Sequence, residues 1–255
     1  MELQDKVALV TGSSQGIGQA IAERLAQFGA NIVIDYRSHS EGAEQTRKLV
    51  ETAGAKAVVV RADLSSIDQI RNLIESGINS FGRIDILVNN AGIEKRKDFW
   101  DVTEEEYDAV MAVNLRGTFF ATQFFVNHLR AAKRPGKVIN ISSVHEELPF
   151  PHFTSYCMSK GGMKMMCRNL AIELAPLGIT VNSVAPGAIE TPINKALLQD
   201  KAKIDALLTK IPLKRLGQPR DVAEVVAFLA SNRSDYITGT TVFVDGGLLW
   251  NYQEQ

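Results

Sequence analysis

The sequence alternates short runs of Val, Ile and Leu with stretches of helical periodicity along almost its whole length. The apolar runs occupy residues 6–11, 31–36, 57–61, 84–89, 137–142, 179–185 and 240–245. The helical stretches occupy residues 16–28, 41–53, 67–81, 104–132, 154–176 and 220–231. Apolar runs without polar alternation are typical of strands buried on both faces of a parallel sheet. The order therefore predicts an α/β fold, a doubly wound parallel sheet of about seven strands with helices on both faces, in one domain spanning residues 1–255.

One segment breaks this alternation. Residues 186–219 follow the sixth apolar run and contain four prolines, Pro186, Pro192, Pro212 and Pro219. Connections of this length inside a compact domain are usually functional loops. We therefore expect residues 186–219 to form a lid over a binding site.

Composition excludes several classes of protein. The 28 Lys and Arg residues balance 29 Asp and Glu residues, giving a net charge of -1. That balance lacks the basic footprint of a protein that binds nucleic acid or an anionic membrane. No apolar run approaches the ~18 residues that span a bilayer, and the acidic N-terminus lacks the basic start of a signal peptide. The chain is predicted to be cytoplasmic and to act on a small molecule.

The cysteines and histidines predict neither a disulfide nor a metal centre. Cys157 and Cys167 lie ten positions apart on one expected helix, about 15 Å along its axis and beyond the reach of a disulfide. The four histidines show no metal-ligand spacing with each other or with the cysteines. We therefore expect reduced cysteines and no bound metal.

A glycine-rich turn follows the first apolar run and leads directly into a helix. Its sequence is Thr11-Gly12-Ser13-Ser14-Gln15-Gly16-Ile17-Gly18. Glycines let the backbone approach a pyrophosphate, and the helix N-terminus offers free N–H groups and the positive end of its dipole. This placement between a strand and a helix predicts a dinucleotide site. The candidate cofactor contacts are Gly12, Ser14, Gln15, Gly16, Ile17 and Gly18.

Four further motifs follow in register with the predicted strands. They are Asn89-Asn90-Ala91-Gly92 after the fourth strand, Asn114 within the stretch 104–132, Ser142-Ser143 at the end of the fifth strand, and Tyr156-Cys157-Met158-Ser159-Lys160 at the start of the next helix. Each motif is weak alone. Together with the glycine turn, they resemble the short-chain dehydrogenase/reductase family over essentially the entire chain.

The resemblance implies a Rossmann-type fold, an NAD(P)-dependent oxidoreductase and a homotetramer. It assigns catalysis to Asn114, Ser143, Tyr156 and Lys160, with Asn114 holding a water that connects Lys160 to solvent. It also implies a set of further cofactor contacts, which are Asp63, Asn90, Ala91, Gly92, Tyr156, Lys160, Pro186, Gly187, Ile189 and Thr191. The apolar last strand and the tail around Leu248 and Trp250 are consistent with a subunit interface.

The Tyr156–Lys160 spacing explains the expected chemistry. Residues four apart share one face of a helix, so Lys160 lies beside Tyr156. A phenol has a pKa near 10, and lowering it by ~3 units requires about 4 kcal/mol. A charged amine at ~4 Å supplies roughly that amount at an effective dielectric constant of 20. Tyr156 is therefore predicted to act as general base in oxidation and general acid in reduction.

The end of the second strand addresses the choice of nucleotide. A carboxylate there binds the 2′-hydroxyl of NAD, whereas an Arg accommodates the 2′-phosphate of NADP. Both residue types occur, as Asp35 and Arg37, and the family's NAD-selecting position falls on Tyr36. We therefore expect Arg37 and Ser38 to favour NADP, and the use of NAD as well is left open.

Longer matches bear on the substrate. The segments from Val138 to Glu146 and from Gly187 to Asn194 resemble the bacterial short-chain glucose 1-dehydrogenases, which implies oxidation of D-glucose at C1 to gluconolactone. Ser143 and Tyr156 would hold the reacting hydroxyl. The polar residues expected around the sugar are Glu94, His145, Glu147 and Asn194, and His145 lies on the same side as Ser143 if the strand continues.

Other functions stay open at this point. A 3-oxoacyl-(acyl-carrier-protein) reductase would use the same four catalytic residues and needs a basic docking surface, for which Lys95-Arg96-Lys97 is a candidate. A steroid, polyol or small-ketone dehydrogenase is a further alternative. A non-catalytic module that senses NADP belongs to a different class and predicts damaged catalytic residues, whereas the four residues here are intact.

Overall fold

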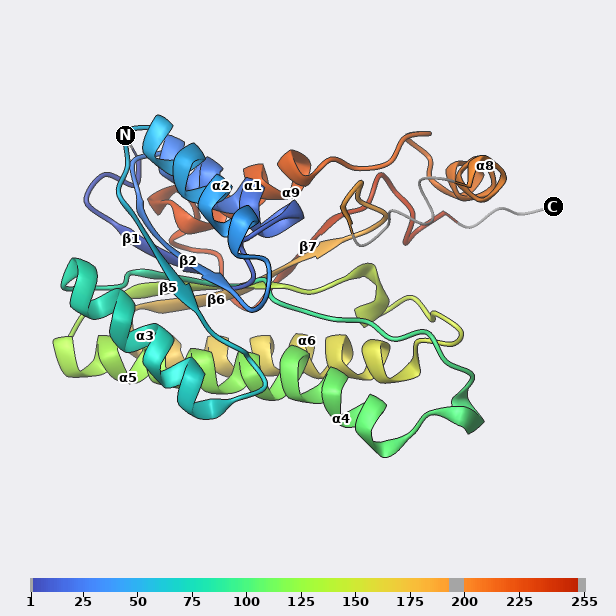
Figure 1. Cartoon of the computed structure of the whole chain (residues 1–255), viewed down its shortest axis with the longest axis horizontal. Helices are drawn as coiled ribbons and strands as arrows, with labels where there is room; N and C mark the ends of the chain where they lie inside the picture. The colour runs from blue at the N-terminus through green and yellow to red at the C-terminus, as the bar shows by residue number, and fades with distance from the viewer. Residues whose placement is uncertain (1, 193–199, 252–255) are drawn as a thin grey trace.

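The structure is a computed structural model that describes residues 2–192 and 200–251. Its centre is a seven-stranded parallel sheet in the order β3-β2-β1-β4-β5-β6-β7 (Figure 1). The strands are β1 (Val7–Val10), β2 (Asn31–Tyr36), β3 (Ala57–Arg61), β4 (Ile86–Asn89), β5 (Gly136–Ile141), β6 (Ile179–Pro186) and β7 (Thr241–Val244). The strand order reverses between β1 and β4, which is where open α/β sheets bind ligands. The predicted α/β fold is confirmed.

Helices cover both faces of the sheet (Figure 1). One face carries α1 (Gly16–Gln27), α2 (Ser40–Thr52) and α9 (Pro219–Ala230), and the other carries α3 (Ile67–Phe81), α4 (Glu104–Met111), α5 (Thr118–Ala132) and α6 (Thr154–Leu174). Short helical turns connect them: η1 (Phe99–Asp101), η2 (Ala112–Gly117), η3 (Val144–Glu146), η4 (Ala175–Leu177) and η6 (Asn232–Ser234).

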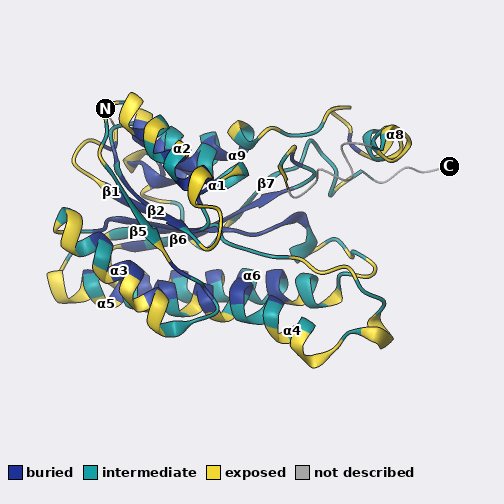
Figure 2. Cartoon of the chain, viewed as in Figure 1, coloured by how far each residue is buried: buried dark blue, intermediate teal, exposed yellow. Residues whose placement is uncertain are grey.

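The core consists of two apolar clusters, one on each face of the sheet. Alternate strand residues supply them: Ile32 and Ile34 belong to the cluster beneath α1 and α9, whereas Val33 between them belongs to the cluster beneath α3 and α5. All three side chains have 0% exposure, and Figure 2 shows the same burial along the central strands. Because both faces of the sheet are buried, these strands show no alternation of apolar and polar residues.

Most boundaries shift by one or two residues, and the larger differences lie among the helices. The helix expected over residues 104–132 is divided by a π-helical turn, η2. The helix expected over residues 154–176 is α6, which ends at Leu174. The segment 186–219 contains a helix that the sequence analysis did not predict, α8 (Lys201–Lys210). α8 stands apart from the sheet in Figure 1, and none of its residues is fully buried.

One helical stretch among the described residues, Glu104–Ala132, is long and apolar enough to cross a membrane by length and composition alone. Its α5 part buries Ala121, Phe125 and Leu129 in the cluster that covers the sheet. A helix of the folded core passes the same test, so the stretch is weak support for a membrane span.

Candidate active site

A cleft of about 930 Å³ lies at the carboxyl ends of β1, β4, β5 and β6. The cofactor residues expected from the sequence all line it: Gly12, Ser14, Gln15, Gly16, Ile17, Gly18, Arg37, Ser38, Asp63, Asn90, Ala91, Gly92, Tyr156, Lys160, Pro186, Gly187, Ile189 and Thr191. Ser143, Glu94 and His145 line it as well. Parallel strands place their carboxyl ends at one edge, which explains how motifs far apart in sequence meet here. Their roles stay predictions.

The glycine turn is built to keep backbone close to a ligand. Gly12 has a φ of 61° and Gly16 a φ of 58°, a left-handed conformation that favours glycine. The Asn90 amide donates to the carbonyls of Thr11 and Gly12 at 2.8 and 3.1 Å and so joins the turn to β4. α1 begins with no side-chain cap. Its first N–H groups and dipole therefore fit the pyrophosphate of a dinucleotide.

Asp35 is a buried part of this turn. Its side chain is 1% exposed, and Oδ2 accepts the N–H of Gly12 at 2.9 Å. Burial raises the pKa of Asp35 to about 7, against a smaller opposing effect of the Gly12 N–H. Oδ1 has no hydrogen-bond partner among the described residues. Arg37, two residues on, is exposed at the cleft, so it is the residue of this pair whose charge is free to meet a phosphate.

Tyr156 and Lys160 lie one turn apart at the start of α6. Lys160 is 3% exposed, its Nζ donates to the carbonyl of Ile141 at 2.8 Å, and it lies 5.6 Å from the centre of the Tyr156 ring. Ser143 is the N-cap residue directly before η3, and its Oγ accepts the N–H of His145 at 3.2 Å. The structure thus brings Ser143, Tyr156 and Lys160 to one end of the cleft.

The expected lowering of the Tyr156 pKa is not found in this structure. Burial raises the pKa of Tyr156 to about 12, and the Ser143 hydroxyl opposes this only in part. Burial also lowers the pKa of Lys160 to about 8. The sequence argument counted the charge of Lys160 but not the loss of hydration that both groups undergo. Without further positive charge, Tyr156 therefore keeps its proton at neutral pH.

Asn114 sits behind the cleft and does not line it. It is 0% exposed in the π-helical turn η2. Its Oδ1 accepts the N–H of Ile93 at 2.8 Å, and its Nδ2 donates to the Ile93 carbonyl at 2.9 Å and to Ser159 Oγ at 3.0 Å. Asn114 therefore clamps the loop after β4 to α6. The π-helical turn is a local signature that functional sites often carry.

The expected substrate residues divide into three groups. Glu94 and His145 line the cleft, whereas Glu147 is exposed and pairs with Lys164 at 2.7 Å. The strand does not continue to His145, because β5 ends at Ile141 and His145 lies in η3. Glu147 was therefore wrongly expected at the cleft. Asn194 lies outside the described residues.

His145 has a defined hydrogen-bonding role. Its Nδ1 lies 3.0 Å from the carbonyl of Leu148, and because a carbonyl only accepts, Nδ1 carries the proton. Burial lowers the pKa of His145, so the ring is neutral at neutral pH and Nε2 is an acceptor. The ring stacks on Phe150 with centroids 4.2 Å apart.

Sequence reasoning missed the apolar wall of the cleft. The segment after η3 supplies Leu148, Pro149, Phe150 and Pro151, and Leu207 and Leu248 line the cleft as well. The run Leu-Pro-Phe-Pro directly after the Ser143 motif was the available signal, since it forms neither a strand nor a helix.

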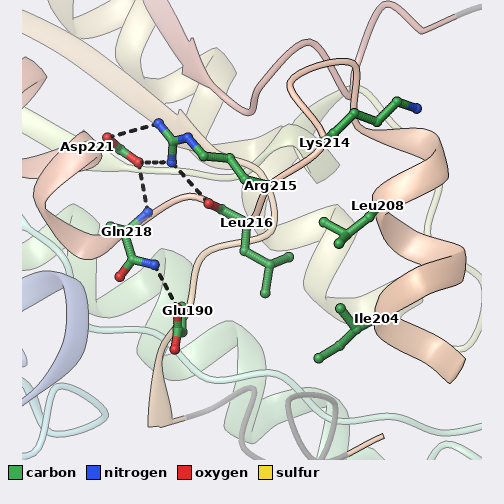
Figure 3. A pocket seen from close by; sticks show the side chains of 8 residues that line it. All are labelled: Glu190, Ile204, Leu208, Lys214, Arg215, Leu216, Gln218 and Asp221. Carbon is green, nitrogen blue, oxygen red and sulfur yellow. Dashed lines mark hydrogen bonds and ion pairs between the residues drawn. The ribbon is translucent and has the colours of Figure 1, made fainter. Parts of the chain in front are cut away.

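A second hollow of about 630 Å³ lies between α8 and the segment that leads into α9 (Figure 3). Four of the polar side chains that line it bond to one another: Arg215 pairs with Asp221 at 2.7 Å, and Gln218 donates to Glu190 at 2.6 Å. None of the four expected catalytic residues lines it. The cleft at the carboxyl edge of the sheet is therefore the candidate active site.

Comparisons with known proteins agree with this geometry. A family model described as enoyl-(acyl carrier protein) reductase matches residues 12–249. The chain is 44% identical to 3beta-hydroxysteroid dehydrogenase 1 of Eggerthella lenta over 97% of this chain and 95% of that protein. It is 41% identical to glucose 1-dehydrogenase 2 of Bacillus subtilis over 97% of this chain and 96% of that one.

The same holds for solved structures. A gluconate 5-dehydrogenase from Burkholderia cenocepacia, in complex with NADP and tartrate, superposes with a TM-score of 0.91 at 39% identity, over 97% of this chain and 96% of that chain. The fold and the cleft are those of an NAD(P)-dependent oxidoreductase that acts on CH–OH groups. The chain belongs to the short-chain dehydrogenase/reductase family.

Proposed function

We propose that the protein oxidises a sugar hydroxyl, with D-glucose at C1 as the substrate and gluconolactone as the product. The observation that carries this is the pair of hydrogen-bond acceptors, Glu94 and His145, that line the cleft beside Tyr156. Burial raises the pKa of Glu94 while the charge of Lys160 opposes this. A polyhydroxyl substrate offers several O–H donors to such groups, whereas an acyl thioester offers none next to its reacting carbonyl.

In the proposed reaction, Tyr156 handles the proton of the reacting hydroxyl. A bound nicotinamide nucleotide supplies the hydride acceptor for oxidation and the donor for reduction. Tyr156 takes the proton of the reacting hydroxyl, or returns it in reduction, and Ser143 holds the substrate oxygen beside the phenol. Because burial raises the pKa of Tyr156 to about 12 in the unliganded protein, the base form requires additional positive charge nearby. Lys160 and an oxidised nicotinamide both carry that sign.

Lys160 is also the proposed link between the phenol and the exterior. Its Nζ is held by the Ile141 carbonyl, and Asn114 lies behind the adjoining loop. An added Cβ at Gly92 would meet Asn114 Oδ1 at 3.5 Å and Lys160 Nζ at 3.7 Å, so the three groups lie close together. We propose that this cluster relays the proton, with Asn114 placing a water.

For the nucleotide we propose NADP, with NAD as a possible second cofactor. Arg37→Ala is expected to weaken the affinity for NADP at least tenfold and the affinity for NAD by less than twofold, because only NADP carries the phosphate that Arg37 meets. Fluorescence titration of both nucleotides measures this. Arg61→Ala is the matched control, since Arg61 is exposed and its Nε donates to the Arg37 carbonyl at 3.0 Å. Equal weakening of NAD and NADP would mean that Asp35 governs the choice.

His145→Ala is expected to raise the Michaelis constant for glucose by roughly ten- to a hundredfold, because a substrate hydroxyl loses its buried acceptor. The nucleotide affinity should stay unchanged. His128→Ala is the control, since His128 lies on α5 and does not line the cleft. An unchanged Michaelis constant in His145→Ala contradicts the assignment. The sequence analysis also places Asn194 among the expected sugar contacts, and the same test applies to Asn194→Ala.

A second candidate substrate class is a 3-hydroxysteroid. The apolar wall formed by Leu148, Pro149 and Phe150 favours it, as does the Eggerthella lenta relative. A turnover panel of glucose, gluconate, a 3β-hydroxysteroid and an acetoacetyl thioester, each with NADP and NAD, separates these readings. Turnover of glucose alone supports the proposal. Turnover of the steroid or the thioester without glucose replaces it.

Three further expectations remain proposals. The homotetramer is supported by β7, an edge strand with partly exposed side chains, and by Trp250, which is 72% exposed. The lid function of residues 186–219 is supported by Pro186, Ile189 and Leu207, which line the cleft. The cytoplasmic location is the third of these proposals.

A further inference from the structure

Three flat rings are stacked in the segment between η3 and α6. The rings of His145 and Phe150 are parallel within 4°, with centroids 4.2 Å apart, and those of Phe150 and Phe153 are parallel within 4°, with centroids 4.1 Å apart. Two rings this close to a third and parallel to it would collide if they lay on the same face of it. His145 and Phe153 therefore cover opposite faces of Phe150, which is the middle of a three-ring stack.

The stack borders the candidate active site. His145 and Phe150 line the cleft, whereas Phe153 is not among the described residues that line it. Because both faces of the Phe150 ring are covered, only its edge can meet a ligand. A ring that carries a flat substrate needs a free face, so Phe150 is not a platform for the substrate. The contacts of its two faces belong to His145 and Phe153 instead.

The His145 imidazole is held from a second direction. Its Nδ1 donates to the Leu148 carbonyl at 3.0 Å, and the backbone N–H of His145 donates to Ser143 Oγ at 3.2 Å. Nδ1 therefore carries the proton, and Nε2 is left as an acceptor. A hydrogen bond fixes one nitrogen but lets the ring plane tilt about it, whereas a parallel ring fixes the plane. The same imidazole meets the Tyr156 ring edge-on, with centroids 6.3 Å apart.

The segment that carries the middle ring is anchored at both ends. The N–H of Leu148 donates to the Val144 carbonyl at 2.8 Å, which closes the segment onto η3. The N–H of Lys97 donates to the His152 carbonyl at 2.8 Å, and His152 Nδ1 pairs with Asp98 Oδ1, so the segment is also joined to the loop after β4. His152 has a φ of 71°, which is uncommon for a residue other than glycine and persists where the surroundings hold it.

We propose that Phe150 is a positioning residue for the substrate, because its ring holds the His145 imidazole in the plane that presents Nε2 to a substrate hydroxyl. The inference rests on the proposed function, in which His145 accepts such a hydroxyl. A side chain that is ordered before binding saves the cost of ordering it during binding. Loss of the stack should therefore weaken substrate binding and leave the chemical step unchanged, since Ser143 and Tyr156 keep their groups.

The first test needs no substrate. Burial lowers the pKa of His145, so its ring is neutral at neutral pH and ¹⁵N NMR distinguishes the two neutral tautomers. Full-length protein with ¹⁵N-labelled histidine is measured without nucleotide, and His145→Ala identifies the His145 signals. The wild type should show the Nδ1–H tautomer alone, with ring protons shifted upfield by the Phe150 ring. In Phe150→Leu these protons should move downfield and the nitrogen signals should move toward a mixture of both tautomers.

Two further variants control this measurement. Phe150→Tyr keeps the flat ring and should retain the wild-type His145 spectrum. Phe119→Leu is the same substitution on α5, where the side chain is 45% exposed and does not line the cleft. It should also leave the His145 signals unchanged.

Steady-state kinetics show whether Phe150 acts through His145. Phe150→Leu should raise the Michaelis constant for glucose by about two- to tenfold, the factor to which the energy of one aromatic pair corresponds, with kcat and the affinity for NADP unchanged. In the His145→Ala background the same substitution should have no further effect, because the residue through which it acts is gone. A merely structural role of Phe150 would instead lower kcat through the start of α6, or add its effect in both backgrounds.

The outcomes separate this proposal from the proposed function. An unchanged His145 spectrum in Phe150→Leu overturns the proposal, as does a rise in the Michaelis constant that persists in full without His145. If Phe150→Leu does not fold, Phe153→Leu removes the outer ring of the stack, with a smaller change of the His145 spectrum in the same direction expected and no change overturning the proposal. A wild-type protein that turns over no sugar contradicts the proposed function alone, because the spectrum without substrate still decides whether Phe150 holds His145.

Discussion

Replacing Tyr156 with Phe is expected to lower kcat by about a hundredfold or more, the usual loss when a general acid–base is removed. Phe keeps the ring, which meets His145 edge-on with centroids 6.3 Å apart, and loses only the hydroxyl. The nucleotide should therefore still bind. Steady-state turnover and a fluorescence titration of NADP on the same sample separate the two effects.

Tyr236→Phe is the matched control for this variant, because it removes the same hydroxyl group from a fully exposed tyrosine outside the cleft. It should retain wild-type turnover. Full activity in Tyr156→Phe contradicts the mechanism outright. Loss of nucleotide binding together with activity points instead to a structural effect of the substitution at the start of α6.

Much of the fold could be read from the sequence because its strands are buried on both faces. Runs such as Asn31–Tyr36 carry no polar alternation, and their burial on alternating sides follows from the pleat of the strand. Two helical segments also end at a glycine, because Gly82 and Gly178 adopt the left-handed conformation that ends a helix. α8 was missed because it lies in a proline-rich segment and buries no residue fully.

The candidate site was predictable where spacing determines geometry and not where the environment does. The i, i+4 spacing placed Lys160 beside Tyr156, as the structure has it. It carried no information on how dry the site is, so the raised pKa of Tyr156 could not be foreseen. Likewise, the sequence analysis expected Glu147 around the substrate, whereas η3 turns the chain after Ser143 and Glu147 pairs with Lys164 instead.

Replacing Gly18 with Ala is expected to weaken the affinity for nucleotide at least tenfold and to lower the melting temperature. A Cβ at Gly18 would lie 2.5 Å from the Gly12 carbonyl oxygen and 2.5 Å from Asn90 Nδ2. These two atoms form the 3.1 Å hydrogen bond that joins the glycine turn to β4. The new methyl group must separate them, and overpacking of this kind costs about 1–3 kcal/mol.

Gly161→Ala is the matched control, because it is the same substitution in a helix, α6, with no atom within 4 Å of the added Cβ. There Ala should stabilise the helix by roughly 0.5–1 kcal/mol, since glycine costs that much backbone entropy in a helix interior. Thermal unfolding and NADP titration of both variants test this. The same substitution should lower the melting temperature at Gly18 and raise it at Gly161. If Gly18→Ala binds NADP like the wild type, the close packing of α1 on the loop after β4 does not hold the turn in its binding shape. The dinucleotide would then depend on the cleft's side chains, Arg37 foremost, and not on the backbone of the turn.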